Sequence, residues 1–489
     1  MTDVNKAIKP VESLIIAPLN EGALYKANNF ILFRIGASNM NMWLTNSSYL
    51  TLDIEYTGQT VSGYSTQTKA CPTYIRNACN LFSQIEVQYG GDTIYSQPYN
   101  IEQNTIKQLY YGEDYLSGNY ATYTTREMVV KDMYDTKSNS ERLMTGINTH
   151  LKFDNNTASS NTLKDTTIHN VMIPINQLIP LFMDMGSEGF PVRCLKQQIE
   201  IRLYIAEPYR YLVDWNPVTK DFDYRLFLDD ATTMASPIAA SVKQRYPEQS
   251  IKLSNVKMFC QHYLPDSSLA ARIDNEAVNS SDGMNWQFTR HDIAMRQVSQ
   301  INKTNNLPFT ATTENTQSLL LYCHRTGYSP GLMYRPNISS LYISFGSNQL
   351  PFQPIPGNTY SEPFEYKFLT DDTLNCIDTY FSQNNHDYNA SYKYIEDTST
   401  EPATTAMKVP SSSFVLMAAN YVSDPSALGS KSSLWNSQYQ VHFNAPYIDS
   451  TKRSDTSGSE NPSGLTFILG VESKWGLTLQ NGKLTTINI

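Results

Sequence analysis

Apolar and polar residues alternate along several short stretches of this chain, which is the pattern of half-buried β-strands. Successive side chains of a strand point to opposite faces. Residues 50–56 therefore form a predicted strand whose buried face carries Leu50, Leu52, Ile54 and Tyr56. Residues 81–89 and 199–205 alternate in the same way, and the apolar run at 30–35 is typical of a fully buried strand.

A glycine turn follows the strand at 81–89. The sequence Gly90-Gly91-Asp92 separates this strand from an apolar return at 93–95. Glycines between two alternating runs are a hairpin signal, because tight hairpin turns need backbone conformations with positive φ.

One short helix is predicted after this hairpin, at residues 101–111. Asn100 is the expected N-cap, Gln103 occupies the third helical position, and Gly112 lies just beyond the end.

Long polar stretches interrupt the predicted strands at 112–165 and 207–249. Loops of this length in a compact domain usually carry function or contacts. A strand at 254–263 is expected to close a first β-sandwich. A hairpin with arms at 465–471 and 477–484 is expected to close a second one.

The second half of the chain repeats the plan of the first. Residues 341–350 resemble 85–94 position by position, since both are alternating strands that turn on a glycine into an apolar residue. Residues 439–447 resemble 201–209, and both end on Pro-Tyr. Alternating strands can match by accident, but the shared order and spacing favour an internal duplication.

The duplication predicts two domains, as the length of 489 residues also suggests. We expect an N-terminal arm at 1–22, a first sandwich at 23–280 and a second at 281–489, with the boundary in the polar stretch around 279–283.

Composition agrees with an all-β protein. The chain has 33 Tyr and 19 Phe, and only 17% of its residues are charged. Aromatic residues and many Asn, Ser, Thr and Pro breaks favour strands and loops over helices. The predicted fold class is all-β, with two tandem eight-stranded antiparallel jelly-roll sandwiches, long loops and few short helices.

The net charge of −9 argues against a protein whose main role is to coat nucleic acid, which would show a basic face. No apolar segment follows the N-terminal lysines, and no stretch approaches the length of a transmembrane helix. We therefore expect a protein that is not secreted.

No recognisable motif of catalysis or metal binding is present. The sequence lacks a phosphate-binding loop, an HExxH pair, paired CxxC motifs and a GxSxG elbow. Cys323 and His324 are adjacent, but neighbours on a strand point to opposite faces, so the two make a poor joint metal site. The acidic pairs 229–230 and 371–372 are interpreted as exposed loop residues. We assign no catalytic, cofactor-binding or metal-binding residue, expect no cofactor, and predict that the protein is not an enzyme.

Six cysteines are scattered without metal-ligand spacing. They are interpreted as buried reduced thiols, with a disulfide between Cys71 and Cys79 as the alternative; the six are Cys71, Cys79, Cys194, Cys260, Cys323 and Cys376.

Two segments carry a family resemblance. Residues 79–91 (CNLFSQIEVQYGG), followed by Tyr99-Asn100 and the helix to 110–112, resemble the LFSQ-strand-turn region of double jelly-roll major capsid proteins of polintons, polinton-like viruses, adintoviruses and virophages. Residues 173–182, leading into 199–205, are similar to that family's proline-apolar segment before a long strand. The resemblance covers the first half best and reaches the second through the internal repeat.

This resemblance implies a structural role in a virion. Members of the family form homotrimers, whose six sandwiches make a pseudo-hexagonal capsomer that tiles an icosahedral shell around a double-stranded DNA genome. The implied partners are other copies of the chain, penton proteins and minor or cement proteins, with no sequence-specific nucleic-acid binding. Assembly takes place inside the host cell. The loops 112–168 and 381–411 are expected at towers or trimer seams. The arm 1–22 contacts a neighbouring capsomer, an internal membrane or a cement protein, or is disordered.

Two other functions remain as alternatives. A carbohydrate-binding or carbohydrate-cleaving β-sandwich would also use loops rich in Tyr, Asn and Trp, and it predicts a monomer with a groove of aromatic residues. A minor or vertex capsid component would keep the fold, but such proteins are usually single sandwiches.

Overall fold

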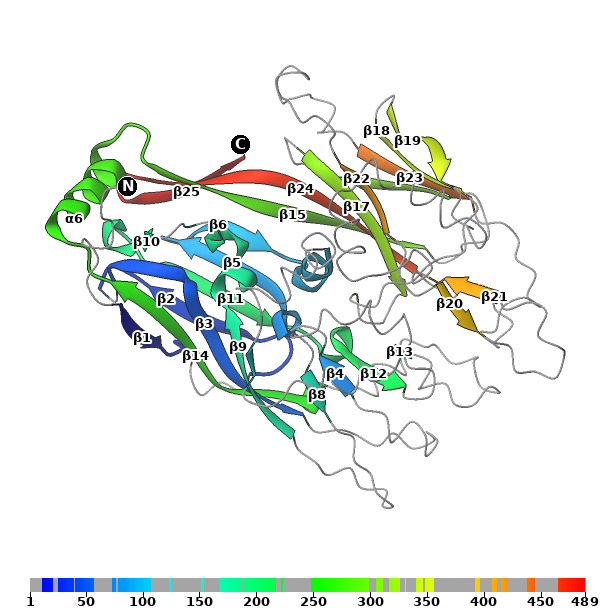
Figure 1. Ribbon diagram of the computed structural model, residues 1–489, viewed down its shortest axis with the longest axis horizontal. Coiled ribbons are helices and arrows are strands. Elements are labelled where there is room, and N and C mark those ends of the chain that lie inside the picture. Colours follow the sequence, from blue (N-terminus) through cyan, green and yellow to red (C-terminus); the bar gives the residue numbers. More distant parts are fainter. Residues whose placement is uncertain are drawn as a thin grey trace.

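The computed structural model shows two β-sandwiches side by side, joined by long strands that run from one to the other (Figure 1). It describes residues 11–20, 25–38, 40–56, 73–75, 78–106, 123–124, 151–153, 167–183, 185, 188–216, 221–222, 248–298, 305–310, 316–325, 330, 340–345, 348–355, 392–395, 407–410, 415–419, 438–444 and 465–488.

Two antiparallel sheets form the first sandwich. One has the strand order β1-β14-β3-β9-β7, with β10 also on β3, and the other has the order β2-β11-β5-β6. Their bounds are β1 Glu12–Ile16, β14 Ile251–Tyr263, β3 Met42–Tyr56, β9 Thr167–Pro174, β7 Tyr123–Thr124, β10 Phe190–Pro191, β2 Phe30–Ile35, β11 Ile199–Ile205, β5 Phe82–Tyr89 and β6 Asp92–Gln97. A small sheet beside them contains β13 Asp221–Phe222, β12 Leu212–Asn216, β4 Thr73–Ile75 and β8 Leu151–Phe153.

The hydrophobic alternation in the sequence explains how these sheets face each other. In β3 the side chains of Leu50, Leu52, Ile54 and Tyr56 are all buried, as the pattern predicted. β11 alternates between buried and half-buried residues over its whole length. The hairpin of β5 and β6 turns at Gly90 and Gly91, which both have positive φ. The apolar faces of the two sheets therefore meet in one core.

The second sandwich has the same kind of construction. One sheet has the order β15-β24-β17-β22, with β25 on β24, and the other has the order β16-β23-β18-β19. Their bounds are β15 Met284–Val298, β24 Leu465–Gln480, β17 Thr316–Arg325, β22 Val415–Ala419, β25 Lys483–Asn488, β16 Asn305–Thr310, β23 Gln438–Asn444, β18 Ser340–Phe345 and β19 Asn348–Ile355, and a separate hairpin contains β20 Tyr392–Ile395 and β21 Met407–Pro410. The predicted all-β class and the predicted repeat of two antiparallel sandwiches are confirmed.

Helices in the described residues are short and lie at connections. They are α4 Ile175–Leu178, α6 Ser267–Asp274, the helical segment 100–106, the π-helical turn η9 Asn275–Asn279, and the 3-10 turns η3 Ala78–Leu81, η4 Pro180–Phe182, η5 Val192–Cys194, η6 Pro208–Arg210 and η8 Glu248–Ser250. None of the described helices is long and apolar enough to cross a membrane.

The connection from the first sandwich to β15 is held in place at several points. The Asp266 carboxylate caps α6 by accepting a hydrogen bond from the Leu269 N–H (2.8 Å), which lowers the pKa of Asp266. Arg193 pairs with Asp274 near the end of α6 (2.8 Å). The polar stretch 279–283, where the domain boundary was predicted, begins at the last residue of η9 and ends directly before β15.

Two local predictions are wrong. The expected closing hairpin with a break at 472–476 does not exist, because β24 runs unbroken to Gln480 and the turn lies at Asn481 and Gly482, which both have positive φ. Asn100 does not cap the predicted helix. The chain is helical at 100–106, its first turn bonds from the Gln103 N–H to the Tyr99 carbonyl (2.9 Å), and the Asn100 side chain points elsewhere.

Part of the predicted arm lies on the first sandwich. Residues Glu12–Ile16 form β1, which pairs with β14 at the edge of its sheet. The loops predicted to carry contacts, 112–168 and 381–411, lie outside the described residues apart from the strands and strand ends given above. Cys79, Cys194 and Cys260 are buried and form no disulfide, so Cys79 is not in the disulfide with Cys71 that was kept as an alternative.

Candidate functional site: the joint between the two sandwiches

The three-stranded ribbon β15-β24-β25 belongs to the second sandwich by pairing, but it covers one side of the first. The Trp286 ring lies 5.4 Å from the Phe190 ring, and the Phe288 ring lies 5.9 Å from the Tyr95 ring, measured between centroids. Phe190 and Tyr95 come from the two opposite sheets of the first sandwich. The ribbon therefore seals the gap between these sheets, and Leu477, Leu479 and Leu484 join the same hydrophobic core.

Hydrogen bonds fix the ribbon at its turn. The carbonyl of Gly482 accepts from the Tyr89 hydroxyl and from the Lys196 N–H (3.2 Å). Farther along, the Thr486 hydroxyl donates to the Ile94 carbonyl on β6 (2.9 Å). The bonds from Tyr89 and Thr486 join residues 393 and 392 positions apart in the chain, so these contacts set the position of the C-terminal hairpin on the first sandwich.

The helical segment 100–106 forms a polar wedge between the sandwiches. All of its residues are buried, although most of them are polar. The Gln103 side-chain amide donates to the His291 carbonyl on β15. Ile106 lies against β24 at Gly470, where a Cβ atom would come within 2.3 Å of the Ile106 Cδ1 atom. The missing side chain of Gly470 is what lets the wedge approach the ribbon.

A chain of buried hydrogen bonds holds the start of the wedge. The Tyr95 hydroxyl donates to Gln97 (2.6 Å), and the Gln97 amide donates to Asn100 Oδ1 (2.7 Å). Asn100 Nδ2 in turn donates to the carbonyls of Cys79 and Phe82 (2.7 Å each). Burial raises the pKa of Tyr95, so its hydroxyl stays protonated and acts as the donor. Buried networks of this kind are stabilising when their members are satisfied.

An ion pair ties the wedge to the first sandwich. The Glu102 carboxylate, whose side chain is 1% exposed, accepts a hydrogen bond of 2.5 Å from the Arg210 guanidinium. Arg210 lies in η6, directly after β11. A buried carboxylate needs such a partner, because an isolated charge in a protein interior is strongly unfavourable.

A second ion pair lies on the ribbon. Arg290 donates to the Asp292 carboxylate (2.8 Å), and its guanidinium stacks 4.7 Å above the Trp475 ring. Burial raises the pKa of Asp292, and the neighbouring Arg290 partly offsets this effect. Both charges act electrostatically on the buried Tyr95 hydroxyl.

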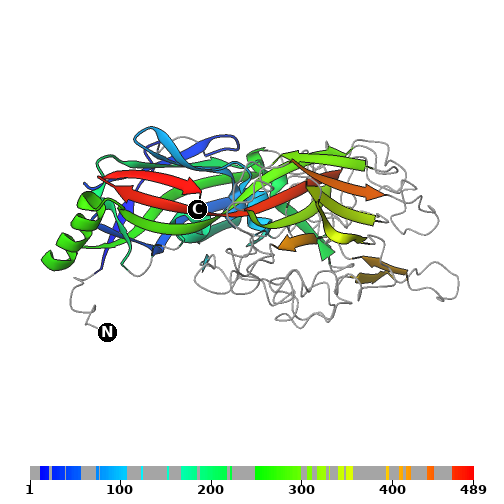
Figure 2. The same cartoon turned by 90° about the horizontal axis from the view of Figure 1, so that it is seen from above.

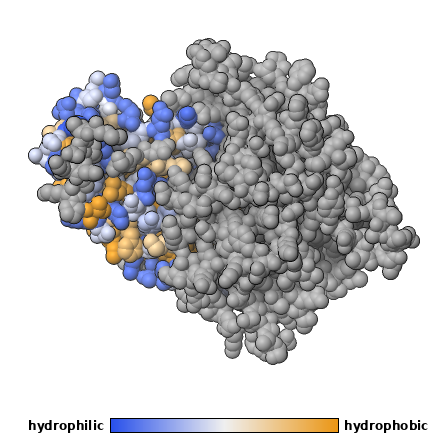
Figure 3. Space-filling model, viewed as in Figure 1, coloured by the Kyte–Doolittle hydropathy of each residue, from blue (hydrophilic) through white to orange (hydrophobic). Residues whose placement is uncertain are grey.

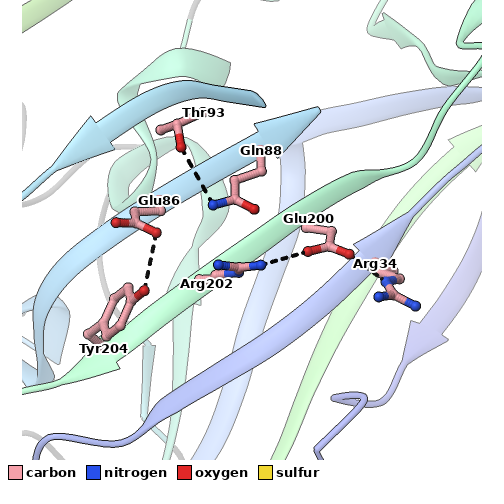
Figure 4. Close-up of polar contacts among 7 residues, drawn as sticks. All are labelled: Arg34, Glu86, Gln88, Thr93, Glu200, Arg202 and Tyr204. Atoms are coloured by element: carbon pink, nitrogen blue, oxygen red, sulfur yellow. Dashed lines mark hydrogen bonds and ion pairs between the residues drawn. The ribbon is translucent and has the colours of Figure 1, made fainter. Parts of the chain in front are cut away.

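The outer face of the sheet β2-β11-β5-β6 carries a ladder of polar side chains (Figure 4). The Glu200 carboxylate pairs with Arg34 (2.8 Å) and with Arg202 (3.1 Å), and the Tyr204 hydroxyl donates to Glu86 (3.2 Å). Partial burial opposes the ionisation of Glu200, but hydrogen bonds from the two arginines lower its pKa overall. Both carboxylates of the ladder, Glu200 and Glu86, are paired with neighbouring side chains, so we interpret the ladder as a solvated sheet face and not as an acid-base pair.

The candidate residues named from the sequence do not come together at the joint. No cluster of three or more His, Cys, Asp or Glu side chains able to hold a metal ion occurs among the residues that the structure describes. The acidic pairs 229–230 and 371–372 lie outside the described residues, as does the side chain of Cys323, while His324 is buried. Sequence reasoning missed the joint itself, because β15 alternates poorly and was not recognised as a strand.

Comparison with solved structures gives the fold a name. A chain of the Sputnik virophage structure has a TM-score of 0.51 with this chain at 9% identity, covering 99% of this chain and 89% of that one. The chain has the double jelly-roll fold. The mavirus major capsid protein is similar over 97% of this chain and 90% of its own, at 10% identity and a TM-score of 0.49. The Faustovirus major capsid protein is similar over 98% and 93%, at 7% identity and a TM-score of 0.47.

Sequence comparison adds nothing to the double jelly-roll assignment. No family model matches the chain, and no curated protein matches it in sequence. At identities near one residue in ten, the shared feature is the arrangement of strands.

Proposed function

We propose that this double jelly-roll protein is a major capsid protein. Three copies form a pseudo-hexagonal capsomer, and capsomers tile an icosahedral shell around a double-stranded DNA genome. The observation that carries the proposal is the joint, which holds two sandwiches of the same strand order in a fixed relation within one chain. The likeness to a chain of the Sputnik virophage supports it.

A fixed joint matters for a tile because the two sandwiches of one chain must occupy adjacent positions of a ring. If they moved freely, three copies would not close into a regular particle. Closed cyclic assembly is the ordinary way for identical chains to saturate their interfaces. The apolar contacts, the polar wedge and the ribbon turn each restrict a different part of the joint.

The role proposed here is structural, and its place is the virion, with assembly inside the host cell and without secretion. Its partners are other copies of the chain, penton proteins and minor or cement proteins. The proposal assigns no cofactor, no catalytic residue and no sequence-specific contact to nucleic acid.

The test is the mass of the purified full-length protein in solution, measured by light scattering over a range of concentrations. The proposal predicts a stable particle of three chains, each of 55.4 kDa. A protein that stays monomeric at high concentration and binds to a glycan array would contradict the proposal and support the carbohydrate-binding alternative.

A further inference from the structure

The strands of the two sandwiches correspond one to one in their pairing order. The order β1-β14-β3-β9 in the first corresponds to β15-β24-β17-β22 in the second, and β2-β11-β5-β6 corresponds to β16-β23-β18-β19. The strand β1 is therefore the counterpart of β15, and β6 is the counterpart of β19. Each pair of counterparts occupies the same place in its sandwich.

These counterparts differ in what covers them. Trp286 and Phe288 of β15 pack against Phe190 and Tyr95, on the side of the first sandwich that carries β6. The corresponding strand of the first sandwich, β1, lies on the opposite side of that sandwich from the ribbon (Figure 1). No described segment of the chain covers its outer face.

The outer face of β1 and of the turn after it is apolar. Ile15 and Leu19 are each 54% exposed, and Val11 is 48% exposed. Seven large hydrophobic residues are exposed among those that the structure describes, and three of them are in this group. Figure 3 shows apolar surface where Figure 1 labels β1. We call Val11, Ile15 and Leu19 the β1 stripe.

Backbone and side-chain hydrogen bonds hold the β1 stripe in place. β1 pairs with β14 along its whole length. Beyond it, the Leu19 N–H donates to the Leu32 carbonyl (2.8 Å), and the Asn20 amide donates to the Phe30 carbonyl (2.6 Å). The segment thus bridges the edges of both sheets, as the ribbon does on the other side. Apolar side chains presented on a fixed backbone are typical of an interface rather than of a loose terminus.

We propose that the β1 stripe binds a second copy of this chain, on the β19 side of its second sandwich, in the way that β15 packs on the β6 side of the first sandwich. This inference rests on the proposed function and names the contact between copies. The occupant follows from the repeat, since the one face known to receive a β15-type strand is a β6-type face. β19 carries Leu350, Phe352 and Ile355 in its sequence.

The geometry accounts for closure of the particle. Each copy presents one β1 stripe and one β19 side, so the contact is head-to-tail, and head-to-tail contacts form a ring when the rotation closes. The joint within a copy relates the first sandwich to the second by a rotation. If the contact between copies repeats this rotation, joints within and between copies alternate and place six sandwiches around one axis. Three copies then complete the ring.

The test is a pair of charge substitutions in the full-length chain, Ile15→Glu with Leu19→Glu, studied by sedimentation velocity and light scattering. We expect at least a tenfold increase in the concentration needed for assembly. The matched control is Ile487→Glu, because Ile487 is 53% exposed but lies on β25, at the other side of the same sandwich. The control is expected to assemble like the unmodified protein.

Folding is checked by the thermal unfolding of each variant. If the double glutamate variant is misfolded, Ile15→Thr with Leu19→Thr replaces it, and a threefold or larger weakening of assembly is expected. Hydrogen exchange gives an independent measurement: amides of 12–16 and 348–355 are expected to exchange more slowly in the assembled unmodified protein than in the dissociated variant.

The outcomes separate the two proposals. An unmodified protein that never assembles contradicts the proposed function. An unmodified trimer that the double substitution leaves intact overturns the role of the β1 stripe and leaves the capsid function standing. If the trimer persists but flotation with anionic phospholipid vesicles is lost in the variant, the stripe binds a membrane, and the contact with a second copy is overturned.

Discussion

The strands β1 and β15 hold the same place in their two sandwiches but lie in different surroundings. β15 is 15 residues long, and its Phe288 is 2% exposed against the sister sandwich. β1 is five residues long, and its Ile15 is 54% exposed. One fold therefore uses the same edge of a sandwich twice, once within the chain and once facing outward. The difference separates the contact that the chain makes within itself from the one that we propose it makes with another copy.

The largest expected effect on stability comes from removing a side chain of the contact between β15 and the first sandwich. Phe288→Ala removes a buried ring that packs on Tyr95, and we expect it to lower the free energy of unfolding by about 3–5 kcal/mol. The control is Phe30→Ala in the dissociated chain. Because Phe30 is 40% exposed, its loss is expected to cost only about 0.5 kcal/mol. Urea titrations followed by tryptophan fluorescence measure both, and equal losses would contradict the distinction.

The polar wedge gives the next largest effect. Arg210→Gln leaves the buried Glu102 carboxylate without its partner, and we expect a loss of about 3 kcal/mol. The matched substitution Arg202→Gln removes a partly exposed pair with Glu200, where about 0.5 kcal/mol is expected. Thermal unfolding compares the two. A larger effect at Arg202 would mean that the outer ladder, and not the wedge, holds the structure together.

The contact between the wedge and the ribbon can be tested by a double-mutant cycle. Gly470→Ala places a Cβ atom against Ile106 Cδ1, and we expect a loss of about 1–2 kcal/mol. Ile106→Val removes that methyl group and is expected to restore part of the loss in the double variant. The coupling energy between the two sites is the measured quantity. Simple additivity would show that the two residues do not touch.

The smallest expected effect is a pH dependence at the joint. Folding raises the pKa of Asp292, so the folded state binds more protons and stability falls as the pH rises from about 4, the unfolded value. Asp292→Asn is therefore expected to gain stability relative to the unmodified protein between pH 4 and pH 7.

Glu200→Gln is expected to lose stability at pH 7 relative to the unmodified protein. Folding lowers the pKa of Glu200, so the stability that this carboxylate contributes is lost as the pH falls. Chemical unfolding at pH 4 and pH 7 tests both variants. The same trend in both would contradict the assigned directions.

Much of the fold could be predicted from alternation alone. β3, β5 and β11 were recognised because one face of each is apolar and the other polar, and the turn at Gly90 because two glycines separate such strands. The hairpin at Asn481 and Gly482 was missed although Asn-Gly is a strong turn signal, because the preceding apolar run suggested an earlier break.

The joint could not be predicted in the same way. The helical segment 100–106 is rich in polar residues, which indicates a surface, yet Gln103 bonds to His291 and Glu102 pairs with Arg210, both distant in sequence. β15 packs on the first sandwich through Trp286 and Phe288, but buried and exposed residues do not alternate cleanly along the rest of the strand. Such contacts depend on where the second sandwich lies, and local pattern does not contain that information.

The central claim is that one joint, repeated within and between copies, builds the particle. The most direct measurement is averaged electron-microscope images of the purified particle viewed along its axis. We expect six similar densities around the axis of a particle that contains three chains. A two-lobed particle with the mass of one chain, 55.4 kDa, would contradict it.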